Sequence, residues 1–285
     1  MKIEFSMKKR WVSISIVSFL FVILYLPLFL ALVQNWIDDH DYSHGFFVPL
    51  ISAYFVWKKK NILQSLSAEP NNVGLIILIG GLLLYSISLI GDIAFTARLS
   101  MLIVLAGIII YLSGKTIFKE LLFPWAFLIF MIPIPYVLIT SIAFSMRLFA
   151  SKWAALLIKL IGMPVMREGN IIHLSNTSLE VGDPCSGLRS LVSLLALGTI
   201  YAYVSQKSNI KRMILSLSTI PIAIIANIFR IAATALLAYV YGEKVAQGFL
   251  HEFSGIVVFI IALLLLIMIG TILKRIPLKG QSVEH

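Results

Sequence analysis

Long apolar segments separated by short polar ones dominate the pattern along the chain. A helix needs roughly 20 apolar residues to cross a bilayer, and most of these segments approach that length. The pattern predicts eight crossings, at Trp11–Val33, Gly45–Trp57, Val73–Ile90, Ala97–Leu112, Leu121–Thr140, Leu188–Val204, Met213–Tyr241 and Phe253–Leu273. We therefore predict an all-α integral membrane protein with about eight transmembrane helices, organised as a single domain over residues 1–285.

A ninth apolar segment, Phe144–Met163, carries Arg147, Lys152 and Lys159. If it crossed the membrane, every later loop would change sides. We expect it to be an amphipathic helix lying in the outer interface of the membrane.

Prolines mark the two ends of this part of the chain. Pro133 and Pro135 should bend the end of the preceding span, because proline removes a helical hydrogen bond. After Pro164, residues Val165–Val181 contain two short β-type runs around a Ser-Asn-Thr turn. This pattern predicts a small extracytoplasmic β-hairpin.

Composition excludes a soluble globular domain. The 285 residues are 60% hydrophobic and 13% charged, with a mean hydropathy of +0.98, whereas soluble domains carry about 25% charged residues. The net charge of +10 does not indicate a nucleic-acid partner, because the cations collect at the ends of apolar spans. Fifteen of the 23 Lys and Arg residues fall in alternate loops. The positive-inside rule then predicts that both termini are cytoplasmic. Trp11–Val33 is too long for a signal peptide, so we expect it to be a retained span.

Cys185 is the only cysteine of the chain and lies where a polar segment meets an apolar one. Asp183 and Pro184 form a helix-start signature. This predicts Cys185 in a first helical turn, where free N–H groups favour a thiolate, with Arg189 one turn further on. Cys185 could equally be a small apolar packing residue.

Arg230 lies inside the seventh predicted span, three residues after Asn227 on the same helical face. A buried arginine costs at least about 2.5 kcal/mol at the centre of a span, so it should face a polar partner or cavity. The residue is then either half of a structural pair between helices or a fixed cation in a cavity that opens outward.

Two histidines are candidates for proton transfer. His251 begins the last span at the predicted depth of Cys185, and it is either a solvated cap or a base. A thiol at a helix start, a histidine at the same level and an arginine facing the cavity would form a cysteine acyl-transfer set. His44, in an outer polar loop, could bind substrate, ligate a metal or mark a wet interface. No spacing typical of zinc ligands is present, so we predict no metal and no cofactor.

Several motifs together resemble the exosortase/archaeosortase family of membrane transpeptidases. They are Gly-Asp-Pro-Cys185-Ser-Gly-Leu-Arg189-Ser, Asn227-Ile-Phe-Arg230, the late His251 and the early Tyr42-Ser-His44-Gly-Phe-Phe-Val-Pro49. The resemblance implies a thiol protease and transpeptidase for protein sorting, associated with exopolysaccharide systems. Its substrates would be exported proteins ending in a Pro-Glu-Pro motif, a transmembrane helix and a basic tail (PEP-CTERM).

The family pattern also implies roles for individual residues. Cys185 would be the nucleophile that forms a thioacyl-enzyme, His251 the general acid/base, and Arg230 the group that stabilises the thiolate or oxyanion. Arg189 would assist, with Asp183, Asn227 and His44 as supporting or substrate-binding residues. The enzyme would lie in the bacterial cytoplasmic (inner) membrane with its site at the periplasmic face. The acyl acceptor stays open between water, a lipid amine and a glycan.

Two other classes of function remain as alternatives. A polytopic transporter could use Arg230 and Asn227 as an anion site, although we find no inverted repeat to support it. A structural scaffold for an exopolysaccharide machine would leave Cys185 incidental. Only the transpeptidase requires the thiol, so a Cys185→Ala variant separates the three.

Overall fold

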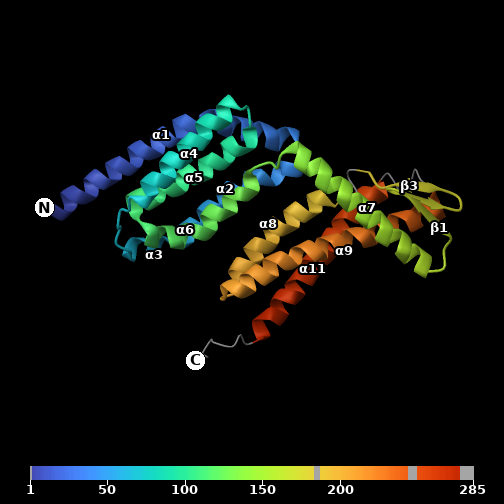
Figure 1. The fold of residues 1–285 in the computed structure, drawn as a ribbon. Coiled ribbons are helices and arrows are strands. Elements are labelled where there is room, and N and C mark those ends of the chain that lie inside the picture. The colour runs from blue at the N-terminus through green and yellow to red at the C-terminus, as the bar shows by residue number, and fades with distance from the viewer. Residues whose placement is uncertain (1, 183–186, 243–248, 277–285) are drawn as a thin grey trace. The chain divides into compact units, whose positions relative to one another are not determined.

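The computed structural model describes residues 2–182, 187–242 and 249–276, and the chain divides into two compact units, Met1–Pro135 and Tyr136–His285. Helices make up most of each unit (Figure 1). The predicted fold class, an all-α integral membrane protein, is confirmed. The units are described one at a time.

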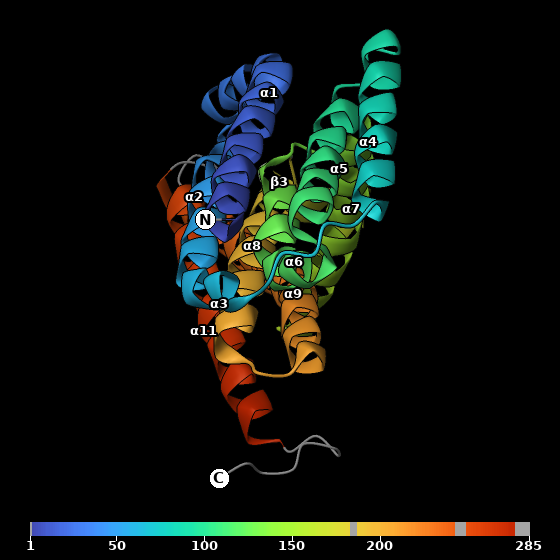
Figure 2. The same ribbon diagram turned by 90° about the vertical axis from the view of Figure 1, so that its left-hand side faces the viewer.

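The first unit is built from helices joined by short connections. It contains α1 (Lys2–Asp38), the 3-10 helix η1 (His40–Phe46), α2 (Phe47–Lys58), α3 (Lys60–Ser65), α4 (Val73–Ile90), α5 (Ala94–Ser113), α6 (Lys115–Phe127) and the 3-10 helix η2 (Leu128–Met131). Helices α4 and α5 run side by side (Figure 2). A Cβ atom on Gly107 would lie 2.6 Å from the backbone N of Leu78, and one on Gly74 would meet the backbone of Tyr111. Glycine permits such an approach, which is a common way to pack helices in a membrane.

In its described residues, 136–182, 187–242 and 249–276, the second unit combines four helices with a small sheet. Its elements are α7 (Tyr136–Leu160), β1 (Val165–Glu168), β2 (Ile171–Leu174), β3 (Ser178–Glu180), α8 (Leu188–Ser205), α9 (Asn209–Tyr241) and α11 (Phe249–Arg275). Helices α8, α9 and α11 pack together around Leu194, Leu215 and Leu266, each at most 1% exposed. The C-terminal half of α9 packs instead against α7 and the sheet.

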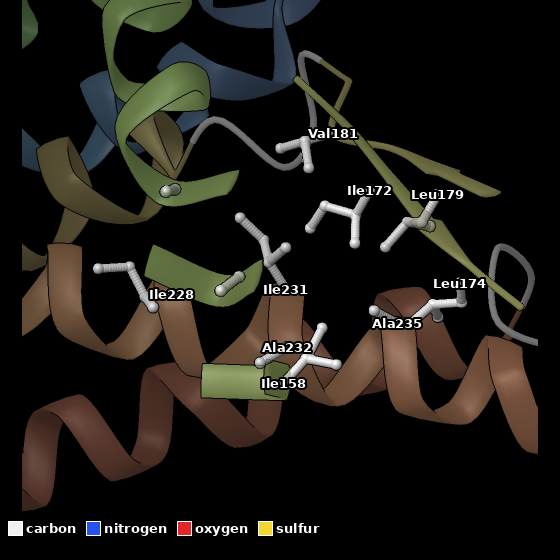
Figure 3. Packing of buried hydrophobic residues seen from close by; sticks show 11 residues of the cluster. Ile158, Ile172, Leu174, Leu179, Val181, Ile228, Ile231, Ala232 and Ala235 are labelled. Carbon is white, nitrogen blue, oxygen red and sulfur yellow. The ribbon is translucent and has the colours of Figure 1, made fainter. Parts of the chain in front are cut away.

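The predicted hairpin is present, with a third strand added to it. The strands are antiparallel in the order β1-β2-β3. Ile172 and Leu179 pair across β2 and β3, and both enter a core that includes Ile158 of α7 and Ile231 of α9 (Figure 3). Val181 is 1% exposed in the same core. The sheet thus fixes the chain against α9 just before Asp183.

Six helices are long and apolar enough to cross a membrane by length and composition: Val12–Asp38, Val73–Ile90, Ala94–Ser113, Tyr136–Leu160, Asn209–Tyr241 and Ser254–Arg275, counted over the described residues. Ser190–Ser205 is a shorter apolar helix. Large side chains such as Ile76 and Ile90 are 71% and 88% exposed on α4, as expected where a helix faces lipid. These findings fit a multi-pass membrane protein.

Two of the predicted spans differ from the helices that the structure forms there. The segment Gly45–Trp57 forms only the 12-residue α2, about 18 Å long, against a hydrocarbon core of about 30 Å. The segment Leu121–Thr140 is broken, since α6 ends at Phe127 and α7 begins at Tyr136. Pro133 and Pro135 do more than bend this helix, because they fall in the irregular stretch between the two.

The helix that contains the predicted amphipathic segment begins earlier in the chain than expected. Phe144–Met163 is not a separate element, because α7 runs unbroken from Tyr136 to Leu160. In Figure 1, α7 crosses α9 obliquely, whereas α8 and α9 run alongside each other. Its place in the membrane interface stays a prediction.

Candidate active site

Arg230 lies deep within α9 and is 9% exposed. Eleven residues separate it from the C-terminal end of the helix at Tyr241, or about 16 Å along the axis. The helix is hydrophobic enough to span a membrane. A guanidinium held there needs polar surroundings, because its charge is costly to bury.

Asn227 provides part of these surroundings. It lies one turn before Arg230 and is 4% exposed. Both side chains line a small cavity of about 10 Å³ between α8, α9 and α11, together with Ser190. That volume is roughly one water molecule, and the rest of its lining is apolar. Polar groups in such a setting interact strongly because the local dielectric constant is low.

Gly187 places the start of α8 directly against Asn227. It is the N-cap of α8 and has a φ of +77°, in the left-handed region. A Cβ atom at this position would lie 2.7 Å from Cγ of Asn227. Glycine therefore meets two demands at once, a left-handed backbone and a close contact with a buried amide.

The position of Gly187 corrects the predicted helix start. Helix α8 begins at Leu188 and has no side-chain cap, so Asp183 is not its N-cap and Pro184 is not its first residue. Left-handed backbone at Gly187 interrupts any helix that would continue into α8. The argument that placed Arg189 one helical turn after Cys185 therefore does not hold.

Helix α11 reaches the site through Gly255. A Cβ atom on Gly255 would lie 3.7 Å from Cζ of Arg230, so the guanidinium rests close to the backbone of α11. His251 stands four residues earlier, one turn along the same face of this helix. Three helices thus meet at Asn227 and Arg230.

Several predicted site residues, or their side chains, are not among those that the structure describes. Cys185 and Asp183 fall outside the described residues, and so do the side chains of Arg189 and His251. Among the described side chains, the structure brings Asn227 and Arg230 together, as their spacing in the sequence indicates.

His44 belongs to the first unit, where it joins two turns. Its Nδ1 lies 3.1 Å from the carbonyl oxygen of Asp41 and its Nε2 lies 3.1 Å from that of Phe130. A neutral imidazole has one N–H, so it can donate to only one of these carbonyls at a time. Both ring nitrogens therefore have structural contacts.

Neighbouring side chains hold the same turn in place. Trp36 Nε1 donates to the carbonyl oxygen of Met131 at 3.0 Å, and the hydroxyl of Tyr42 accepts from the N–H of Ile134 at 3.2 Å. Burial raises the pKa of Tyr42, so its phenol stays protonated at neutral pH. The loop that contains His44 is thus fixed to the segment that precedes α7.

A second, larger groove reaches Asn227 from the side of α7. Its volume is about 300 Å³, and it is lined by Ser145, Met146, Phe149, Ala150, Ile224 and Asn227. The lining is almost entirely apolar. Asn227 therefore borders both this groove and the cavity of Arg230.

Sequence reasoning missed the roles of Gly187, Gly255 and Ser190. Gly187 stands inside the motif around Cys185 and Gly255 lies four residues after His251, but a glycine shows no side-chain chemistry, so its contacts appear only in the fold. Ser190 lies in the first turn of α8. In the sequence, the charge of Arg189 beside it is a more conspicuous sign of a site than the hydroxyl of Ser190.

Comparison with known proteins identifies relatives of this chain. The model of the family described as transmembrane exosortase (Exosortase_EpsH) matches residues 36–268. A protein of Methanocaldococcus jannaschii named "Probable archaeosortase E" is 33% identical over 86 residues, which cover 30% of this chain and 43% of that protein. The chain thus matches less than half the length of this curated relative. No solved structure matches.

Proposed function

The chain belongs to the transmembrane exosortase family, and on this premise we propose that it is a cysteine transpeptidase that cleaves sorting signals from exported proteins. The observation that carries the proposal is the meeting of three helices at Asn227 and Arg230. One of these helices starts just after Cys185, and another carries His251 one turn from the contact with Arg230.

Chain length supports the placing of the thiol. Only Ser186 separates Cys185 from Gly187, and two residues span at most about 7 Å. Because Gly187 abuts Asn227, this short connection along the chain supports a thiol that acts near the buried amide and the guanidinium beyond it.

In the proposed first half-reaction, the Cys185 thiolate attacks the carbonyl carbon of the scissile peptide. The carbonyl oxygen becomes an oxyanion, which Arg230 stabilises. His251, which has taken the thiol proton, gives that proton to the leaving amine as the C–N bond breaks. The products are a thioacyl-enzyme and the released C-terminal fragment.

In the second half-reaction, His251 removes a proton from the acceptor as it attacks the thioester. The C–S bond breaks, the thiolate is regenerated, and the protein is joined to the acceptor. Water, a lipid amine or a glycan would each satisfy this chemistry. Arg189 would assist in stabilising charge.

The substrate would be an exported protein ending in Pro-Glu-Pro, a transmembrane helix and a basic tail. Its helix would enter laterally, and the apolar groove between α7 and α9 offers a path toward Asn227. The basic tail would stay cytoplasmic, with the enzyme in the bacterial inner membrane and its site at the periplasmic face.

The proposal is tested by expressing the full chain with a reporter that carries this signal and measuring the reporter's C-terminus by intact mass. Cys185→Ala should abolish cleavage, and Arg230→Gln should slow it by about 10²–10³-fold, the usual effect of losing an oxyanion donor. Arg212→Gln, at the far end of α9 from Tyr241, is the matched control and should cleave normally.

Each outcome has a definite meaning. A mass increment on the processed reporter would identify the acceptor, and its absence would indicate hydrolysis. Equal cleavage by the parent and the Cys185→Ala variant would rule out this mechanism. The transporter alternative predicts cleavage by neither protein, but the cavity at Arg230 holds only about 10 Å³.

A further inference from the structure

A third pocket in the described part of the unit 136–285 carries three cations. Its volume is about 280 Å³, and it lies between the C-terminal half of α7 and strand β1. Lys152 and Lys159 come from α7 and Arg167 comes from β1. The two lysines are seven residues apart, so they lie two turns apart on one face of the helix.

No carboxylate neutralises these cations in the described part of the chain. Within it, neither Lys152 nor Lys159 forms an ion pair or a hydrogen bond, and the carboxylate that follows Arg167, Glu168, instead lies 3.8 Å from His173. Arg167 Nη1 donates to the carbonyl oxygens of Leu148 (3.3 Å) and Gly169 (2.9 Å). These neutral acceptors hold the guanidinium in place and leave its charge uncompensated.

An exposed apolar stripe on α7 runs beside the three cations. Phe149, Trp153 and Leu160 are 49%, 42% and 74% exposed, and Trp153 and Leu156 line the pocket itself. Tryptophan and long basic side chains are typical of the membrane–water interface. The pocket therefore presents positive charge next to a surface that suits an acyl chain.

We propose that this pocket binds an anionic phospholipid, with the headgroup phosphate between Lys152, Lys159 and Arg167 and an acyl chain along the stripe of α7. A volume of about 280 Å³ is at the small end of ligand sites, so it suits a headgroup rather than a whole lipid. Phosphate is the anion that clustered Lys and Arg recognise. The bound lipid would connect α7 to β1, and this inference does not depend on the proposed transpeptidase activity.

Native mass spectrometry of the purified full-length protein tests the site with phosphatidylglycerol as the probe and phosphatidylcholine as the uncharged comparison. Lys152→Gln with Lys159→Gln should weaken phosphatidylglycerol binding about 25-fold, since one cation near an anionic surface contributes about fivefold. The matched control is Lys115→Gln with Lys119→Gln, which removes two exposed lysines from α6 and should leave binding unchanged. Lys152→Arg with Lys159→Arg keeps the charge and should retain binding.

Three results would overturn the proposal. The first is equal binding of the two lipids, and the second is an equal loss in the α6 control. The third is inorganic phosphate binding as tightly as phosphatidylglycerol to protein stripped of lipid, which would make the pocket a soluble-phosphate site. Retention by the Arg variant shows that positive charge at these positions, and not the lysine side chain itself, supports binding.

Discussion

At the scale of single residues, the candidate site depends on a glycine as much as on its charged groups. Gly187 holds a left-handed backbone and touches Asn227, while the backbone of α11 at Gly255 lies close to the guanidinium of Arg230. The position of a polar side chain buried among helices is set by the atoms packed around it. The glycines therefore fix where the amide and the guanidinium stand.

Gly187→Ala should destabilise the protein by roughly 2–4 kcal/mol, because it adds left-handed strain of about 1 kcal/mol or more and a clash with Asn227. Gly162→Ala is the matched control, since Gly162 has a similar φ of +88° with nothing within 4 Å of its Cβ position. Gly162→Ala should therefore lose only the stability that the left-handed backbone strain costs. Thermal unfolding of the purified variants measures both, and equal losses would mean that the contact with Asn227 contributes nothing.

The site was partly predictable from the sequence, for physical reasons visible at these residues. Arg230 and Asn227 stand out because charged and amide groups are rare inside apolar spans. The helix start at Asp183 was predicted wrongly, because a capping signature reports local preference, whereas the left-handed Gly187 is set by packing against α9. Sequence alone carries no signal for that contact.

At the scale of elements, glycines set the spacing between helices. A Cβ atom on Gly198 of α8 would clash with the Cγ2 methyl of Thr219 on α9 and lie 3.2 Å from Leu266 on α11. Gly198 is thus a point where these three helices pack closely around their common core. Because α8 and α9 carry Gly187 and Asn227, a shift here would move the site.

Gly198→Ala should therefore destabilise the second unit by about 1–3 kcal/mol, the usual cost of overpacking. Thr219→Ser removes the clashing methyl and keeps the hydroxyl that donates to Ser216. The double variant should regain most of the lost stability in thermal unfolding. Failure of this rescue would show that the cost arises from the backbone of α8 and not from the contact.

Two glycines of the first unit should respond to alanine substitution in opposite ways, Gly107 by losing stability and Gly80 by gaining it. Gly107→Ala forces a Cβ atom to 2.6 Å from the backbone N of Leu78, and backbone cannot move aside as a side chain can. Gly80 has nothing within 4 Å, so Gly80→Ala should stabilise α4 by up to about 1 kcal/mol through helix propensity. Thermal unfolding of the two variants gives the sign of each change in stability. A loss of stability in both would contradict the packing described for α4 and α5.

Hydropathy predicted the long helices well and the short ones poorly. Val73–Ile90 was predicted with the bounds that the structure gives it. The break before Tyr136 was missed because the residues around it are apolar on both sides. Windowed hydropathy averages over Pro133 and Pro135, whereas missing N–H groups end a helix locally.

At the scale of the whole molecule, the orientation of the second unit depends on α7. If α8, α9 and α11 each cross the membrane, the turn at Gln206–Ser208 and the end of α11 at Arg275 lie on one side, and the sheet lies on the other. The cations Lys207, Lys211, Arg212, Lys274 and Arg275 gather on the first side. The positive-inside rule then predicts an extracytoplasmic sheet. If α7 also begins on that side, as the sequence predicts, it lies in the interface.

Single-cysteine labelling tests this arrangement, because Cys185→Ala leaves a chain without thiols. In that background Asn61→Cys, Met166→Cys and Asn209→Cys place one thiol each on an exposed position of α3, β1 and α9. In intact cells, a membrane-impermeant maleimide should label Met166→Cys alone, and after permeabilisation it should label all three. If α7 crosses the membrane instead, Asn209→Cys would be labelled in intact cells while Met166→Cys and Asn61→Cys would not. That pattern would place the sheet and the segment of Cys185 in the cytoplasm, where an enzyme acting on exported proteins could not use them.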